Sequence, residues 1–212
     1  MGQETIPQTI STSYGDDEQT VPPDYATSVC NMFAQLGAMG ISVLFSSGDF
    51  GVGGGSCLSN DGKGSRKFLP IFPASCRCFF QYNKYMGFTR WWLQGPFVTT
   101  VGGTTQVNPE VAANFSGGGF SDYFARPTYQ NSAVSSYLQK IGSQYSGLFK
   151  WACCFDSEDL TLLTGTMIST TGRGYPDISA QAFNFQIVYA GKVIRMYGTS
   201  CSAPVNFPLI PR

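Results

Sequence analysis

The chain has 212 residues, a length that suits one domain with a single hydrophobic core of moderate size. Its 13 Lys and Arg residues balance its 13 Asp and Glu residues, so no net charge would draw it to nucleic acid or to an anionic membrane surface. No apolar run approaches the roughly 20 residues of a spanning helix, and we expect neither a nucleic-acid nor a membrane partner.

The first part of the chain predicts a β-α-β unit. The alternating, β-branched stretch 7–15 predicts a strand. Segment 24–40 carries apolar residues at helical spacing, with Asp24 as the expected N-cap and Gly40 as the stop. The mostly apolar segment 41–47 follows directly and is typical of a strand that a parallel sheet buries on both faces.

Later segments extend this pattern. We expect a buried strand over 98–105, a helix beginning near Asn131, and a hairpin over 185–198 that turns at Ala190 and Gly191. Open α/β sheets keep their functional residues in the loops at the strand ends. The sequence therefore predicts an α/β fold with its chemistry in those loops.

Two segments, 77–95 and 150–171, do not show this alternation of predicted strands and helices. The first contains seven aromatic residues, and the second begins with an aromatic residue and two adjacent cysteines. Neither shows a sustained helical or strand period. We interpret both as loops that pack on the core, with a binding loop as the alternative.

Ser200 is the candidate nucleophile. It lies among small residues that leave room for a substrate, and Pro204 fits the first turn of a helix, which would place Ser200 at the helix N-terminus. Backbone amides there favour developing negative charge. The same sequence is also typical of an ordinary N-cap. The chain contains no histidine, so the usual base for a serine is absent.

Asp49 follows the predicted strand 41–47 and precedes a glycine-rich loop. An aspartate in this position commonly caps the loop through an Asx-turn. The glycine-rich stretches 51–56 and 116–121 lack the spacing of a phosphate-binding loop. We therefore exclude nucleotide binding at these glycines.

The chain has seven cysteines, and without histidine a Cys/His zinc site is excluded. Cys57 and Cys76 bracket the loop after Asp49 and form the disulfide we predict, which would contribute about 3 kcal/mol in the chain-entropy model. Asn114 heads a glycosylation sequon, completed by Ser116. Both features favour an oxidising compartment.

Seven segments, in order, resemble the sedolisins, or serine-carboxyl peptidases, and among them the fungal tripeptidyl-peptidase type. The resemblance implies a subtilisin-like α/β fold with a mostly parallel sheet flanked by helices, so that residues 1–212 form a partial peptidase domain, truncated at both ends and with insertions at 77–95 and 150–171. The matching segments are 10–22, 30–55, 72–76, 98–105, 116–130, 172–181 and 197–204.

This resemblance also implies the site. Ser200 matches the family nucleophile, and Asp49 matches the aspartic acid whose protonated carboxyl stabilises the tetrahedral intermediate. Gly117, Gly118 and Gly119 match a segment that borders the substrate cleft. The family uses a Glu backed by an Asp as the base and hydrolyses peptides or proteins in acid, outside the cell. We also expect a monomer, and a structural role for Asp177.

The chain differs from the family in two features, the Glu-Asp pair that acts as the catalytic base and the ligands of the Ca²⁺ ion. Glu4 has no Asp four residues later, and Asp17 and Glu18 lie in a predicted turn that does not match the Glu-Asp pair. The family's Ca²⁺ ligands, which follow a long helix beyond Pro204, have no counterpart here. We expect no cofactor in this chain, whereas the complete family domain would hold Ca²⁺.

The sequence thus predicts a serine-type peptidase domain that acts at acidic pH, either as an endopeptidase or by releasing tripeptides. One alternative is an inactive fragment that lacks the Glu-Asp pair. Another is a secreted binding module that uses the aromatic residues between Phe79 and Trp92 on glycans or surfaces.

Overall fold

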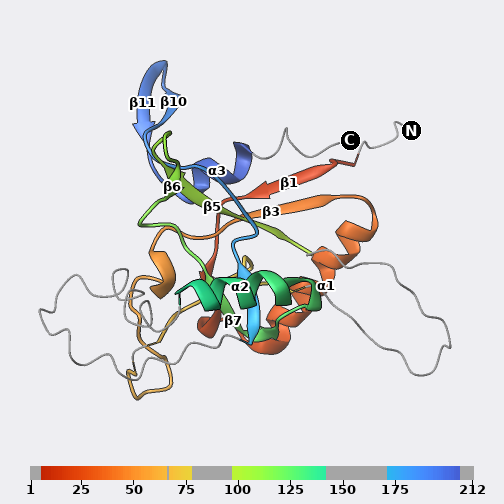
Figure 1. Ribbon diagram of the computed structural model, residues 1–212. Coiled ribbons are helices and arrows are strands. Elements are labelled where there is room, and N and C mark those ends of the chain that lie inside the picture. Colours follow the sequence, from red (N-terminus) through yellow and green to blue (C-terminus); the bar gives the residue numbers. More distant parts are fainter. Residues whose placement is uncertain (1–5, 66, 78–96, 142–170, 206–212) are drawn as a thin grey trace, which may run out of the picture.

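The computed structural model describes residues 6–65, 67–77, 97–141 and 171–205. A five-stranded sheet forms its centre, in which four strands are parallel and the short β6 is antiparallel to β5 (Figure 1). This mostly parallel sheet with flanking helices confirms the predicted α/β class. Its strands are β1 (Thr9–Thr12), β3 (Ser42–Ser46), β5 (Thr99–Thr105), β6 (Val111–Ala112) and β9 (Ile178–Gln181).

The predicted β-α-β unit is present. β1 pairs in parallel with β3, and α1 (Pro23–Ala38) connects them. The prediction of Asp24 as N-cap is wrong: Pro22 holds that position without a side-chain hydrogen bond, and Pro23 begins the helix, where its missing N–H costs nothing. Gly40 follows the helix at φ +84°, a conformation that favours glycine, and ends it as expected.

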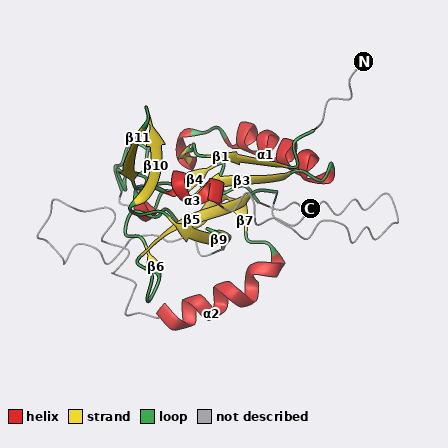
Figure 2. Cartoon of the chain, turned by 90° about the horizontal axis from the view of Figure 1, so that it is seen from above, coloured by secondary structure: helices red, strands yellow, loops and turns green. Residues whose placement is uncertain are grey.

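Helices cover both faces of the sheet. Val43 and Phe45 face α1 and join Ala26 and Cys30 in one core cluster, whereas Leu44 packs with Ala203 of α3 (Thr199–Val205) on the other face. This alternation follows from the two-residue period of a strand. Figure 2 views the same arrangement from above, with α3 in front of the strands.

Smaller elements complete the fold. β7 pairs antiparallel with β8 beside α2, and β10 and β11 form the predicted hairpin, which projects from the body and turns at Ala190 and Gly191, both at positive φ (Figure 1). The remaining bounds are β2 (Asp16–Asp17), η1 (Glu18–Thr20), η2 (Gly51–Gly53), β4 (Ile71–Phe72), β7 (Gly119–Ala125), η3 (Thr128–Gln130), α2 (Asn131–Ile141), β8 (Gly172–Tyr175), β10 (Phe185–Tyr189) and β11 (Lys192–Met196).

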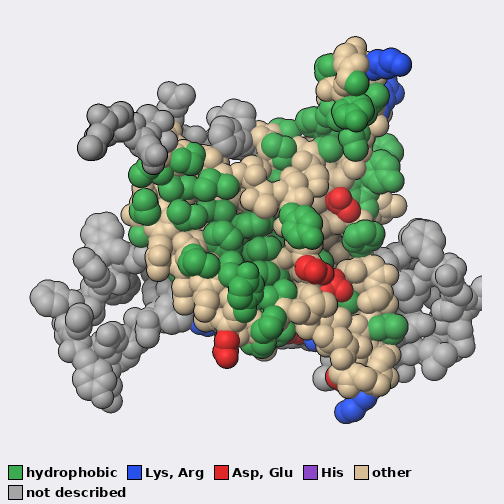
Figure 3. Space-filling model, turned by 180° about the vertical axis from the view of Figure 1, so that it is seen from behind, with side chains coloured by type: hydrophobic (Ala, Val, Ile, Leu, Met, Phe, Trp, Pro, Cys, Tyr) green, Lys and Arg blue, Asp and Glu red, His purple; other side chains and the backbone are tan. Residues whose placement is uncertain are grey.

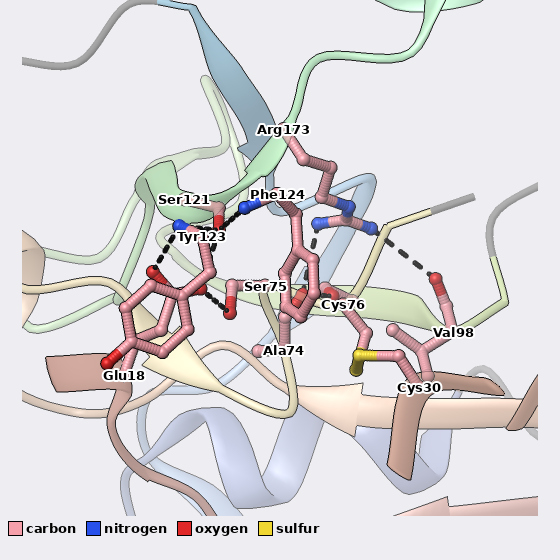
Figure 4. Close-up of a disulfide and its surroundings, with 11 residues drawn as sticks. Glu18, Cys30, Ala74, Ser75, Cys76, Val98, Ser121, Tyr123, Phe124 and Arg173 are labelled. Carbon is pink, nitrogen blue, oxygen red and sulfur yellow. Dashed lines mark hydrogen bonds between the residues drawn. A yellow bond between two sulfur atoms is a disulfide. The ribbon is translucent and has the colours of Figure 1, made fainter. Parts of the chain in front are cut away.

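A buried carboxylate joins three segments of the chain (Figure 4). Oε1 of Glu18 accepts hydrogen bonds from the hydroxyls of Ser75 (2.6 Å) and Ser121 (2.5 Å). Oε2 accepts the backbone N–H groups of Asp122 (2.7 Å) and Tyr123 (3.2 Å). Burial nevertheless raises the pKa of Glu18 above its ordinary value of 4.5, against the opposing effect of these bonds.

Arg173 is a second buried charge, fully enclosed beside the same region (Figure 4). Its guanidinium donates to the carbonyls of Ala74 (3.0 Å) and Val98 (3.4 Å) and pairs with the carboxylate of Asp177. Asp177 also accepts the N–H of Thr100 at 2.8 Å. These contacts agree with the structural role predicted for Asp177.

The predicted Cys57–Cys76 disulfide is wrong. Cys76 is bonded to Cys30, and both side chains lie in the main core cluster. Cys30 lies on the buried face of α1, opposite the segment after β4, so helix packing brings the two sulfurs together although 46 positions separate them. Cys57 is disulfide-bonded as well, while Cys201 has a free thiol.

The two predicted insertions, 77–95 and 150–171, lie outside the described residues except for their ends, Arg77 and Thr171. They stay predictions, as does the single partial domain over 1–212. No described helix has the length and apolar character that crossing a membrane requires.

We expect the double variant C30A/C76A to lower the free energy of unfolding by about 2–5 kcal/mol, because the bond restrains the unfolded chain. Urea denaturation without reductant measures the change. C201A, which removes a free thiol, serves as the control. Failure to recover a peptide cross-linked through Cys30 and Cys76 from the oxidised protein would contradict the pairing.

The raised pKa of Glu18 predicts a pH dependence of stability. The folded chain binds this proton more tightly than the unfolded chain, so the stabilisation is complete below about pH 4.5 and is lost as the pH rises through the folded pKa. Relative to E18Q, which does not titrate, the wild-type chain should therefore lose stability as the pH rises above the ordinary glutamate pKa of 4.5.

Urea denaturation of both proteins across this pH range gives the comparison. E110Q is the matched control, because the side chain of Glu110 is exposed. An unchanged difference between wild type and E18Q at all pH values would show that burial does not govern the Glu18 proton.

Candidate active site

The segment between β3 and η2, residues 47–50, carries Asp49 and is called the Asp49 loop below. It begins where β3 leaves the sheet. The N–H of Ser47 still donates to Val101 of β5 (3.0 Å), and the chain then turns at Gly48, whose φ of +102° favours glycine. Asp49 follows as a half-buried residue before η2. The end of a parallel strand thus delivers a carboxyl group to the sheet edge, as the sequence predicted.

Thr199 holds the Asp49 carboxyl from the other side. Its N–H and its hydroxyl both donate to Oδ1 of Asp49, at 2.6 and 2.8 Å, although 150 positions separate the two residues. The hydroxyl in turn accepts the N–H of Gly48 at 3.1 Å. Ser200 is the next residue in the chain, so the structure brings the two predicted catalytic residues together.

Ser200 is exposed in the first turn of α3. The helix is anchored beneath it, since Ala203 packs on the sheet and the Ser202 hydroxyl donates to the Thr199 carbonyl (2.8 Å). Among the described residues, no hydrogen bond joins the Ser200 hydroxyl to a carboxylate. Within the described residues, the candidate nucleophile is therefore not bonded to a carboxylate that could act as its base.

Pro204 is not in the first turn of the helix, contrary to the prediction. It lies inside α3, where it cannot donate the usual hydrogen bond to the carbonyl of Ser200 four residues earlier. The hydroxyl of Ser13 donates to that carbonyl instead, at 3.3 Å. A residue just beyond β1 thereby steadies the backbone of the candidate nucleophile.

The predicted substrate-binding glycines lie against the Asp49 loop. The N–H of Gly117 donates to Gly48 (2.7 Å), and the N–H of Gly51 donates to Phe115 (2.8 Å). Gly117 itself is buried, and a Cβ there would lie 2.1 Å from the Ser47 carbonyl oxygen, so its close packing is structural. Gly118 and Gly119 are half-buried, and their contact with substrate stays a prediction.

Exposed aromatic rings flank the two catalytic candidates. Phe50 follows Asp49, and its side chain is 65% exposed. Tyr197 lies three residues before Ser200 and is 70% exposed, and its ring centroid lies 5.8 Å from that of Phe115. Figure 3 shows hydrophobic side chains spread over the rear face of the described chain, with few charges among them. The exposed rings of Phe50 and Tyr197 suit contact with apolar groups of a ligand.

Cys201 lies directly beside Ser200 and carries a free thiol. Burial raises the pKa of this thiol, and the negative charge of Asp49 raises it further. The thiolate is the reactive form of cysteine, so both effects lower the reactivity of Cys201.

Asn114, the glycosylation candidate, is exposed in the turn between β6 and β7. Ser116 of the same sequon accepts the N–H of Gly103 at 2.9 Å. Modification of Asn114 stays a prediction. Within the described ranges, no three acidic or cysteine side chains converge to hold a metal ion.

Thr199 is the site residue that sequence reasoning did not single out. The signal was present, because Thr199 stands between Gly198 and Ser200 in the segment that carries the nucleophile. Its contact with Asp49 depends on the sheet and could not be read from either segment alone.

No protein-family model matches the chain. Curated proteins do match it. It is 48% identical over 98% of its length to the probable tripeptidyl-peptidase SED3 of Arthroderma benhamiae. It is 44% identical over 97% of its length to the tripeptidyl-peptidase SED2 of Arthroderma otae, and 46% identical over 94% to SED4 of the same species.

A solved structure, that of a Pseudomonas sedolisin (serine-carboxyl proteinase) with two molecules of pseudo-iodotyrostatin, shares the fold. It aligns with a TM-score of 0.54 and 22% identity over 94% of this chain. The chain is thus similar over almost its whole length to fungal tripeptidyl-peptidases and has the fold of a sedolisin. It spans about 28% of SED3 and SED2 and 45% of the Pseudomonas sedolisin chain.

The close packing of Gly117 predicts a cost for any side chain in this sedolisin-type site. G117A should lower the free energy of unfolding by about 1–3 kcal/mol, because its Cβ meets the backbone oxygen of Ser47. G37A, in α1 with nothing within 4 Å of the added Cβ, should instead stabilise the chain by about 0.5 kcal/mol. Thermal and urea denaturation of the two variants measure the contrast, and equal effects would contradict it.

Proposed function

We propose that this chain supplies the nucleophile and the oxyanion-stabilising carboxyl of a serine-carboxyl peptidase that hydrolyses peptide bonds in acid. The observation that carries the proposal is the pair of hydrogen bonds from Thr199 to Asp49, which fixes a carboxyl group beside the exposed Ser200. The similarity to the tripeptidyl-peptidases SED3 and SED2 supports the same assignment.

In the proposed reaction, the Ser200 hydroxyl oxygen attacks the carbonyl carbon of the scissile peptide bond. The π electrons of that carbonyl move to its oxygen, and Asp49 in its protonated form donates a hydrogen bond to this oxygen. Acid solution supplies the proton on Asp49. The proton of Ser200 passes to a carboxylate base, the role that the family gives to its Glu-Asp pair.

The names of the relatives support one substrate class. The three curated matches given above are named tripeptidyl-peptidases or probable tripeptidyl-peptidases, which favours removal of tripeptides over cleavage inside a chain. The exposed rings of Phe50 and Tyr197 beside the site suit apolar substrate side chains. Gly118 and Gly119 would lie along the substrate backbone, where the lack of side chains permits close approach. We propose an extracellular location on the same grounds.

One observation favours a second candidate, a domain that binds peptides without hydrolysing them. Within the described ranges the Ser200 hydroxyl has no carboxylate partner. General-base assistance contributes about 10²–10⁴-fold to rate, so the 212-residue chain should turn over substrate slowly or not at all. The aromatic binding module between Phe79 and Trp92 lies outside the described residues and receives no support from them.

We expect a peptide aldehyde to add to Ser200 at about pH 4, because hemiacetal formation at equilibrium needs the nucleophile and the oxyanion donor but no turnover. In this addition Oγ bonds to the aldehyde carbon, and the hydroxyl proton ends on the new hemiacetal oxygen. A ¹³C-labelled aldehyde carbon reports the product by NMR. S200A should abolish the hemiacetal signal.

C201A is the control, since it removes the neighbouring thiol and should leave the signal intact. A hemiacetal that persists in S200A would sink the assignment of the nucleophile. Rapid, Ser200-dependent cleavage of a peptide substrate in a parallel assay would instead show that a carboxylate of this chain supplies the base.

A further inference from the structure

The two oxygens of the Asp49 carboxyl have different surroundings. Oδ1 accepts two hydrogen bonds, one from the N–H and one from the hydroxyl of Thr199. Oδ2 accepts none from the described residues. It lies close to Gly198, where an added Cβ would come within 2.9 Å of it.

The Thr199 hydroxyl is constrained to donate in this direction. It accepts the N–H of Gly48 at 3.1 Å, so its own hydrogen is directed at Oδ1 of Asp49, 2.8 Å away. The side chain is fully buried, and its methyl carbon lies 3.3 Å from the position a Cβ would take at Gly103. Thr199 therefore has little freedom to redirect this bond.

A carboxylic acid carries its proton on one oxygen only. An oxygen that already faces two donors cannot also present a proton of its own without opposing one of them. The proton of a protonated Asp49 accordingly belongs on Oδ2, the oxygen that faces away from Thr199.

We propose that Thr199 is a positioning residue that directs the acidic proton of Asp49 to Oδ2 and aims it at the oxygen of the tetrahedral intermediate formed by Ser200. This role rests on the proposed peptidase function. Gly198 belongs to the same arrangement, because its φ of +139° favours glycine and an added Cβ would lie against Oδ2.

Three variants of the full chain test the proposal. T199V keeps the shape and the N–H of the residue but removes the hydroxyl, whereas T199S restores the hydroxyl. T104V is the matched control: the Thr104 hydroxyl also donates to a carboxylate, that of Glu110, but at an exposed pair outside the site. T199A is a second hydroxyl-free variant that decides the test if T199V does not fold.

The first readout needs no catalysis. The residue-199 amide proton, which donates to Asp49 in the wild-type chain, should resonate downfield in wild type, T199S and T104V. It should move upfield in T199V, because the carboxyl is no longer held by a second donor. An unmoved amide resonance in T199V, or in T199A in its place, would overturn the positioning role.

The second readout is the dissociation constant of the ¹³C-labelled peptide aldehyde at about pH 4. T199V should weaken hemiacetal formation about tenfold, the usual effect of one lost hydrogen bond, while T199S and T104V stay within about twofold of wild type. Equal affinity in wild type and T199V overturns the proposal. If the wild-type chain forms no hemiacetal while the amide shifts as expected, the proposed function fails and the positioning of Asp49 by Thr199 stands.

Discussion

The position of the whole candidate site depends on the buried carboxylate of Glu18. A buried charge is costly unless donors surround it, and four donors from the segment after β4 and from β7 converge on Glu18. This convergence holds β7 against η1 and the segment after β4. The glycine segment that leads into β7 then reaches the Asp49 loop through the bond from Gly117 to Gly48. An acidic residue distant from Ser200 in the sequence thus helps to set the position of the site.

Much of the fold could be predicted from local patterns. The apolar run 41–47 is short, lies between two glycines and comes directly after the segment with helical spacing. A buried strand is the element that fits these features. The turn at Ala190 and Gly191 is a two-residue signal between apolar runs, and it forms the expected hairpin. Asp49 and Ser200 could be found through the family resemblance, because both lie in strongly patterned segments at the ends of elements.

Other features depend on contacts between distant segments, and the sequence carries no local signal for them. Glu18 lies in a polar, acidic stretch whose sequence predicts an exposed turn, but in the structure the Glu18 side chain is completely buried. The partner of Cys76 is decided by which face of α1 meets the core, and the Cys57 pairing was inferred from spacing alone. Pro204 was placed by a statistical preference, and the hydroxyl of Ser13 permits it inside α3.

The separation of 150 positions between Asp49 and Thr199 has a consequence for biosynthesis. A ribosome adds about 5–20 residues per second, so the strand that delivers Asp49 leaves the exit tunnel many seconds before its partner. Contacts of such long range also close late in folding, because the intervening chain must first be ordered. Until that moment the nascent chain has a loop carboxyl and no oriented serine, so the proposed catalytic site assembles only after most of this chain has been synthesised.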